Sequence, residues 1–426
     1  MSQSPVYLVP TSYKHQSGAG AADGSPGILE TGIGLVARGS GRHQSFLKAW
    51  TGLPGDWYCR CRLDRFPPVC NWTFLEVKVG ISSRRLQCLF RQASAYYTCL
   101  AHILIYLVIT RFELDYVISY VLDKNIQPEN RAVLITGCDS GFGHALAKRL
   151  DSIGFHVFAS CLFPEGKGAC DLKKLCSKRL QVLELNVKED ESVRKAFEFV
   201  KQNLGTSEFW ALVNNAGIQK GIDVELTSMA DFKETIEVNT FGMVRVTKAF
   251  LPMLRQSRGR VVNLTSLAGR LSIPHVTSYT MSKFAAVAFS ECLKQEMEVW
   301  DVKVISIEPE MFLTQMTEGE GLVKRIEDTL SSLDEGVKSD YGEKYFKSSQ
   351  RAGELIVKIA SPDVSPVINA LEAAVSLEYP RSVYKPCRNI FMKIPLYILE
   401  RVPRPLIDVL IKAFCTVIGF PKPREA

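Results

Sequence analysis

The chain has 426 residues, of which 46% are hydrophobic and 23% charged, and its formal net charge is +7. This balance is that of a globular protein and excludes a chain that is disordered throughout. The basic residues form no stripe interleaved with aromatic residues, which argues against a nucleic-acid partner. The twelve cysteines include no CxxC pair and no His/Cys cluster with zinc spacing. We therefore expect free thiols and no metal site.

Residues 1–96 differ from the rest of the chain and are predicted to be a largely disordered leader. The first 45 are rich in Gly, Ser and Ala and show no sustained periodicity. Residues 1–97 hold eleven Lys and Arg against five Asp and Glu, an acid-poor bias that organellar transit peptides share. Because the stretch is long and its arginines form no amphipathic helix, a transit peptide is one interpretation among several.

A candidate membrane anchor follows at residues 97–125. Two apolar blocks, 97–110 and 116–122, are separated by a segment that carries Arg111, Glu113 and Asp115. Each block is shorter than the roughly 20 apolar residues that span a bilayer, and the intervening charges would be costly at its midplane. A helix that lies in the membrane interface and a helix packed on the following domain are the two alternatives.

Residues 126–385 are predicted to form a doubly wound α/β domain with a parallel sheet, a Rossmann fold. Short apolar runs alternate there with longer segments of helical period. Such runs are typical of parallel strands buried on both faces, joined by crossover helices. We expect strands at 132–136, 156–162, 180–187, 210–214, 260–264 and 302–308, and helices at 145–153, 191–201, 229–254 and 281–299.

The C-terminal stretch, residues 386–426, is predicted to be an apolar helical tail interrupted by prolines. Residues 407–414 keep an apolar face at helical spacing. An exposed apolar element suggests a membrane surface or a partner. A cover over a substrate pocket is the alternative, and both roles are compatible.

A glycine-rich turn, Gly137-x-x-x-Gly141-x-Gly143, lies between the first predicted strand and the following helix. Glycines there permit a tight turn, close approach of backbone to a pyrophosphate, and close packing of helix on strand. The helix N-terminus adds free N–H groups and a positive dipole end. We therefore expect a dinucleotide at this turn, bound by Gly137, Ser140, Gly141, Phe142 and Gly143.

The ends of the next strands are expected to hold the adenosine half of the dinucleotide. The second strand ends at Cys161, with neither an acidic residue for a ribose 2′-hydroxyl nor an arginine for a 2′-phosphate directly at hand. No Lys or Arg lies in the glycine turn, which favours NAD over NADP. Asn186 and Val187 should lie near the adenine, and Asn215 follows the fourth strand in a short-side-chain loop.

The candidate catalytic residues are Ser266, Tyr279 and Lys283. A Tyr-x-x-x-Lys pair on a helix places both side chains on one face. An ammonium and a positively charged nicotinamide would lower the pKa of the phenol from its usual value near 10, so that it can exchange a proton. Lys283 is also within reach of the ribose hydroxyls of the nicotinamide half. Ser266 follows the neighbouring strand and can hold the substrate oxygen. Tyr120 and Lys124 repeat the spacing but precede the first strand of the sheet.

Asn239 lies within a predicted helix, where asparagine is mildly unfavourable. We therefore expect a functional role for it, such as positioning a water in a proton relay. His275, beside Pro274 in a loop, is interpreted as a pocket wall or a surface residue.

With these residues in order, the chain resembles the short-chain dehydrogenase/reductase family over about residues 130–385. It is similar to the branch that holds mitochondrial D-3-hydroxybutyrate dehydrogenases and membrane-bound retinol and 17β-hydroxysteroid dehydrogenases. The stretches 141–144, 154–159, 340–346 and 365–368 look closest to the hydroxybutyrate group. The resemblance implies NAD, a catalytic Tyr279, substrate contact at Ser266, and Thr314 on the nicotinamide amide.

The sequence is compatible with more than one substrate. A 3-hydroxy acid is the first expectation and a lipophilic alcohol, retinol or a hydroxysteroid, is the second. Where the family usually has Pro-Gly after the sixth strand, this chain has Pro309-Glu310, and Glu310 is expected to add charge beside the nicotinamide pocket. A catalytically silent dinucleotide-binding scaffold is the third reading. We further expect lipid association, a homo-oligomer, and a location at the membranes of the mitochondrion or the endoplasmic reticulum.

Overall fold

The computed structural model describes residues 124–314, 326–329, 331, 333–399 and 401–419. The predicted leader at 1–96 lies outside these residues, and so does the predicted anchor except for its last two positions. All described residues belong to one of the two units of the chain, Thr110–Ala426.

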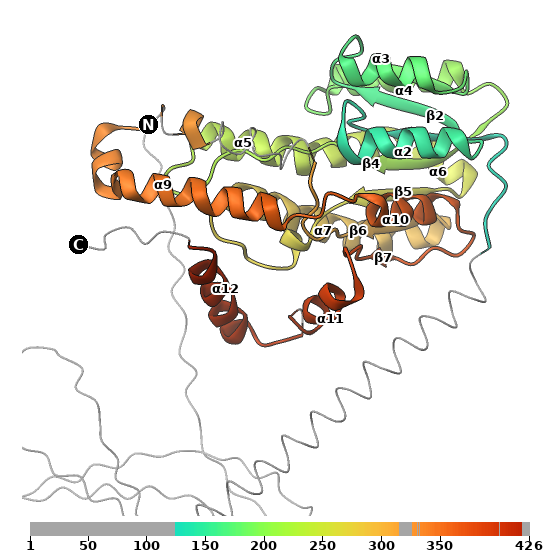
Figure 1. Ribbon diagram of the computed structural model, residues 1–426. Helices are drawn as coiled ribbons and strands as arrows, with labels where there is room; N and C mark the ends of the chain where they lie inside the picture. The colour runs from blue at the N-terminus through green and yellow to red at the C-terminus, as the bar shows by residue number, and fades with distance from the viewer. Residues whose placement is uncertain (1–123, 315–325, 330, 332, 400, 420–426) are drawn as a thin grey trace, which may run out of the picture. The chain divides into compact units, whose positions relative to one another are not determined.

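A parallel sheet is the centre of the described chain, and it confirms the predicted doubly wound fold. Its seven strands follow the order β3-β2-β1-β4-β5-β6-β7, with helices on both faces (Figure 1). The strands are β1 (Arg131–Ile135), β2 (His156–Cys161), β3 (Leu180–Glu184), β4 (Glu208–Asn214), β5 (Arg260–Leu264), β6 (Lys303–Ile307) and β7 (Val383–Tyr384). The chain reverses its direction of winding between β1 and β4, where open α/β sheets bind their ligands.

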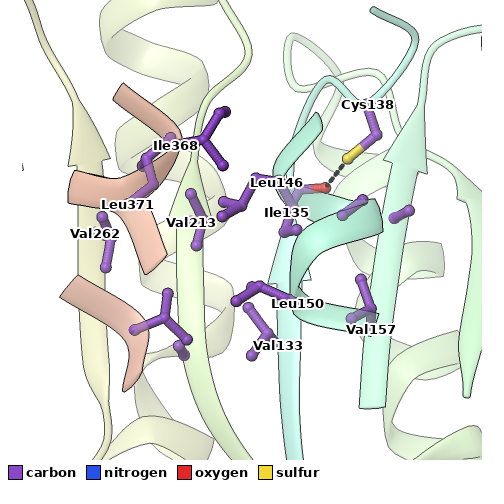
Figure 2. Close-up of a cluster of buried hydrophobic side chains, with 14 of the residues drawn as sticks. Val133, Ile135, Cys138, Leu146, Leu150, Val157, Val213, Val262, Ile368 and Leu371 are labelled. Atoms are coloured by element: carbon purple, nitrogen blue, oxygen red, sulfur yellow. Dashed lines mark hydrogen bonds between the residues drawn. The ribbon is translucent and has the colours of Figure 1, made fainter. Parts of the chain in front are cut away.

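Two apolar cores lie on the two faces of the sheet, because successive strand residues point to opposite sides. Val133 and Ile135 of β1 belong to the core beneath the helices α2 (Gly141–Ser152), α3 (Lys167–Leu175) and α10 (Ser365–Ser376), which Figure 2 shows in part. Ala132 and Leu134 belong to the other core. The helices that cover it are α4 (Asp190–Asn203), α6 (Met243–Ser257) and α7 (Thr277–Met297). Burial on both faces explains why the strands read as continuous apolar runs.

The helix predicted at 229–254 is interrupted in the structure. It consists of α5 (Met229–Ile236), a π-helical segment η1 (Glu237–Gly242) and then α6. Short 3₁₀ segments follow at η2 (Leu267–Gly269) and η3 (Glu298–Trp300). π-helical turns are frequent at functional sites, and here the segment contains Asn239.

The C-terminal part contains α9 (Glu335–Ile359), α11 (Ile390–Leu399) and α12 (Arg404–Ile418), of which α11 and α12 lie within residues 386–426. Prolines mark both tail helices: Pro395 lies inside α11, and a proline starts α12. Within the described residues, no helix combines the length and the apolar character needed to cross a bilayer.

Candidate active site

The glycine turn joins β1 to α2, as the sequence predicts, and its backbone requires glycine. Gly137 and Gly141 have φ of 69° and 60°, the left-handed region that side chains other than glycine rarely adopt. A Cβ at Gly143 would lie 2.4 Å from Nδ2 of Asn215 and 2.5 Å from the carbonyl oxygen of Gly137. The turn is therefore packed too closely against the loop after β4 to accept any side chain at Gly143.

These features fit the pyrophosphate of a dinucleotide. The helix α2 begins directly after Ser140, whose side chain makes no capping hydrogen bond, and its first turn carries no acidic residue. The N–H groups and the positive dipole end of α2 are thus available to an anion. Phe142 lies in this first turn and is partly buried.

Asn215 holds the glycine turn in place. Its amide nitrogen donates to the carbonyl oxygens of Thr136 and Gly137, at 2.8 and 2.9 Å. The Thr136 hydroxyl in turn accepts from the backbone N–H groups of Asn215 and Ala216. Asn215 therefore helps to shape the turn at which the sequence predicts the dinucleotide.

Asp139 is a residue that the sequence reasoning missed. Its carboxylate accepts hydrogen bonds from the backbone N–H groups of Leu162 and Phe163, both at 3.0 Å, just beyond the end of β2. A Cβ at Gly168 would lie 1.9 Å from the Asp139 carbonyl oxygen, so the start of α3 is pressed against the same residue. The glycine turn thus places a carboxylate next to the end of β2, where the strand itself has none.

The remaining predicted adenosine-site residues lie at neighbouring strand ends. Cys161 is fully buried, and its burial raises the pKa of the thiol to about 12, so it is a neutral thiol rather than a nucleophile. Asn186 donates from its side chain to Glu189 at 2.6 Å. The carbonyl oxygen of Val187 accepts from Arg245 at 2.8 Å.

Ser266, Tyr279 and Lys283 come together at the carboxyl end of β5. Ser266 lies two residues beyond the strand, and its side chain is close enough to the phenol of Tyr279, in the first turn of α7, to lower the pKa of that phenol. The Lys283 Nζ atom is buried, lies 5.5 Å from the centre of the Tyr279 ring and donates to the carbonyl oxygen of Leu264 at 2.9 Å. The hydroxyl, the phenol and the amine that the sequence spacing singles out therefore lie in one cluster.

Burial dominates the titration of this cluster. It raises the pKa of the Tyr279 phenol above its usual value of 10, and the hydrogen bond from Ser266 opposes that rise. Burial also lowers the pKa of Lys283 to about 8. In the protein alone the phenol is therefore a neutral acid, and the lowering that we expected requires the positive charge of an oxidised nicotinamide beside it.

The side chain of Asn239 is fully buried and engaged within the protein. Its oxygen accepts from the backbone N–H of Ile218 at 2.7 Å, and its nitrogen donates to the Ile218 carbonyl oxygen at 2.8 Å and to the Ser282 hydroxyl at 2.9 Å. Ser282 in turn donates to the carbonyl oxygen of Tyr279 at 2.7 Å. Since both amide donors are used, the side chain positions the loop after β4 beside α7 and has no donor left for a water.

Two predictions concern the segment after β6. Thr314 lies beside the glycine turn, because its side chain is 3.9 Å from where a Cβ of Gly141 would be. The expectation that Glu310 adds charge to the nicotinamide pocket was wrong. Its carboxylate is buried and paired with the guanidinium of Arg388, which neutralises it.

His275 is half-buried rather than a bare surface residue. Its Nδ1 atom lies 2.6 Å from the carboxylate of Asp223, which also accepts from the hydroxyl of Tyr345 at 2.6 Å. Asp223 therefore links the loop before α7, through His275, to α9, through Tyr345. Because His275 is paired with Asp223, Tyr279 rather than His275 is the residue that faces Ser266.

Fold and site together define a class of protein: a dinucleotide-binding α/β enzyme with a Ser-Tyr-Lys set at the carboxyl edge of its sheet. Comparison with known proteins agrees. Residues 131–322 match the family model of the short chain dehydrogenases. The chain is 38% identical to estradiol 17-beta-dehydrogenase 2 of Mus musculus over 293 residues, 68% of this chain and 76% of that protein.

It is 44% identical to the mitochondrial D-beta-hydroxybutyrate dehydrogenase of Rattus norvegicus over 284 residues, 65% of this chain and 82% of that protein. Among solved structures, a short chain dehydrogenase/reductase of Burkholderia phymatum in complex with NAD covers 71% of this chain and 99% of its own, with a TM-score of 0.51 and 18% identity. That likeness shows the fold. The chain belongs to the short chain dehydrogenase family and is an oxidoreductase that acts on hydroxyl groups.

Proposed function

We propose that the enzyme transfers a hydride between NAD and a secondary alcohol or its ketone, with Tyr279 as the proton donor and acceptor. The observation that carries the proposal is that Ser266, the phenol of Tyr279 and the buried amine of Lys283 lie together at the carboxyl end of β5. Bound NAD would supply the hydride acceptor. Gly137, the N-terminus of α2 and Thr314 would hold it.

In this proposal, each residue of the cluster has a separate task. The Ser266 hydroxyl hydrogen-bonds the substrate oxygen and orients the carbinol carbon. The Tyr279 phenolate takes the hydroxyl proton as the alcohol is oxidised, and the neutral phenol returns a proton as the ketone is reduced. The Lys283 ammonium stabilises the phenolate through space, because opposite charges within a low-dielectric site favour ionisation. Asn239 positions α7 against the loop after β4.

Asp139 supports NAD rather than NADP as the cofactor. Its carboxylate lies at the end of β2, where a 2′-phosphate would have to be placed, and like charges there repel. Asp139→Asn should therefore improve NADP binding relative to NAD, as measured by the ratio of kcat/KM values. An unchanged ratio would remove this support.

Two substrate classes fit the family. The rat relative is named for D-beta-hydroxybutyrate, and the mouse relative for estradiol. Apart from Lys283, three cations of the described segments around Tyr279 have carboxylate partners: Lys220 has Glu234, Arg270 has Glu308, and His275 has Asp223. A hydroxy acid needs a cation for its carboxylate, so this pairing favours an uncharged, lipophilic secondary alcohol such as a hydroxysteroid.

The function is tested by following NADH absorbance with the full-length protein. We expect formation of NADH with estradiol, and a smaller rate or none with D-3-hydroxybutyrate, in the presence of phospholipid vesicles. The reverse order would favour the hydroxy acid. Binding of NADH with no turnover of any alcohol would instead support a silent scaffold.

We also propose that the tail lies on a membrane surface. Apolar side chains of α11 and α12 are exposed, among them Phe391 at 79%, Val409 at 60% and Val417 at 83%. An amphipathic helix of this kind can insert one face among lipid headgroups without crossing the bilayer. A location at mitochondrial or endoplasmic-reticulum membranes and self-association of the chain are further predictions of the same proposal.

A further inference from the structure

Arg388 joins three separate segments of the chain. Its Nε donates to the carboxylate of Glu310 at 3.2 Å, and its backbone N–H donates to the same carboxylate. Its Nη1 donates to the carbonyl oxygen of Ile359 at the end of α9, and its Nη2 reaches that of Met311 at 3.5 Å. The side chain of Glu310 is 4% exposed and that of Arg388 is 23% exposed, so solvent screens the pair little. We call these two residues the clasp.

The residues after the clasp run directly to the glycine turn. Leu313 donates its N–H to the carbonyl oxygen of Ser361 at 2.8 Å, and Ser361 donates to that of Met311 at 3.1 Å, which fixes the backbone next to the clasp. The ring of Phe312 is buried and meets that of Phe142 edge to face, with centroids 6.3 Å apart. Two residues further, Thr314 reaches Gly141.

We propose that the clasp of Glu310 and Arg388 positions residues 311–314 against the glycine turn and so sets the affinity of the site for the nicotinamide half of the dinucleotide. The physical basis is that a buried charged pair with additional carbonyl partners is held in one geometry. A glycine at position 310 could not form this pair, so the loop would lose that support. Both residues act through Thr314 and are positioning residues. The inference rests on the proposed use of NAD and on the proposed contact of Thr314 with its nicotinamide.

A comparison of two ligands separates this role from simple stabilisation. NADH carries the nicotinamide, and ADP-ribose lacks it but shares the adenosine and the pyrophosphate. For Glu310→Gln in the full-length protein, we expect the Kd of NADH to rise about 5- to 30-fold and that of ADP-ribose to stay within 2-fold, since one displaced contact is worth roughly 1–2 kcal/mol. Arg388→Lys keeps the charge but not the planar fork, and should recover part of the loss.

Arg245→Met is the matched control. Arg245 is 22% exposed and also joins three segments through Asp190, Glu237 and the Val187 carbonyl, but it lies at the predicted adenine side. This variant should change the affinities for NADH and ADP-ribose equally.

The proposal is overturned if Glu310→Gln weakens both ligands alike or neither, or if the wild type binds the two equally. If Arg388 variants do not fold, Glu310→Gln decides the question alone, because it keeps the size of the side chain. All measurements are of binding, so a failure of the proposed alcohol oxidation would show separately, as absent turnover in a wild type that still prefers NADH.

Discussion

At the scale of single residues, the burial of Lys283 lowers the stability of the folded protein, although the proposed reaction uses its amine. Burial lowers its pKa to about 8 from a usual value of 10.5, so the folded protein disfavours the charged form. Between these two pH values the unfolded chain binds more protons than the folded one, and stability rises with pH. Below about pH 8 the protein bears the full free-energy cost of keeping Lys283 charged in the folded state, which is at most about 3 kcal/mol.

Lys283→Met should therefore gain stability relative to wild type at pH 7 and lose that gain as the pH approaches 10.5. The lost hydrogen bond to Leu264 reduces the gain by about 1 kcal/mol. Urea unfolding at a series of pH values measures the difference. A difference that does not vary with pH would show that Lys283 titrates normally in the folded state.

Gly143 is a second residue that allows a specific test, because one added methyl group there should weaken dinucleotide binding. A Cβ there would overlap the Asn215 side chain and the Gly137 carbonyl, so Gly143→Ala must displace the glycine turn. We expect the Kd of NADH to rise at least 10-fold by titration calorimetry. Gly336→Ala is the control, because nothing lies within 4 Å of a Cβ at that position. Equal effects of the two variants would contradict the assignment of the turn to the dinucleotide.

At the scale of elements, six of the seven strands were predictable because each is a continuous apolar run. β7 was not predictable, because it has only two residues and is a strand only through its pairing with β6. The interruption of the 229–254 helix by η1 was also missed, since hydrophobic periodicity does not reveal a π-helical turn. Asn239 gave a partial signal, as an unfavourable residue in a helix, but its bonds to Ile218 and Ser282 depend on tertiary structure.

Asn239→Ala tests this element. The substitution leaves the Ile218 N–H and carbonyl, which are partly buried, without their side-chain partner, and each unsatisfied group costs up to about 1–3 kcal/mol. We expect a clear fall in Tm by calorimetry together with a loss of turnover, because Tyr279 lies on the helix that Asn239 holds. An unchanged Tm would mean that the loop after β4 keeps its position without this side chain.

In the site too, some residues could be predicted from the sequence, whereas the roles of others depend on tertiary contacts. The glycine turn and the pair of Tyr279 and Lys283 were predictable because their spacing reflects local geometry within one turn and one helix. Ser266 was predictable from its place after the strand that precedes that helix. Asp139 and Arg388 were not, because their partners lie 23 and 78 residues away along the chain. The charge of Glu310 was misjudged for the same reason.

At the scale of the whole molecule, the exposed apolar side chains of α11 and α12 should control membrane binding. Phe391→Glu with Val417→Glu should reduce co-sedimentation with phosphatidylcholine vesicles several-fold, because charged groups do not insert among lipid tails. Tm should change little, since both side chains are exposed. Val299→Glu is the matched control, because Val299 is 82% exposed next to α7. Equal loss in the control would contradict a specific role of the tail.

The most direct test of the account is the activity of Tyr279→Phe, which removes a single oxygen from the proposed acid and base. We expect kcat for alcohol oxidation to fall about 10²- to 10⁴-fold while the Kd of NADH stays within 2-fold. Tyr379→Phe, a change at an exposed tyrosine, should keep full activity. If Tyr279→Phe retains the turnover of the wild type, Tyr279 is not the group that moves the proton, and the proposed mechanism is wrong.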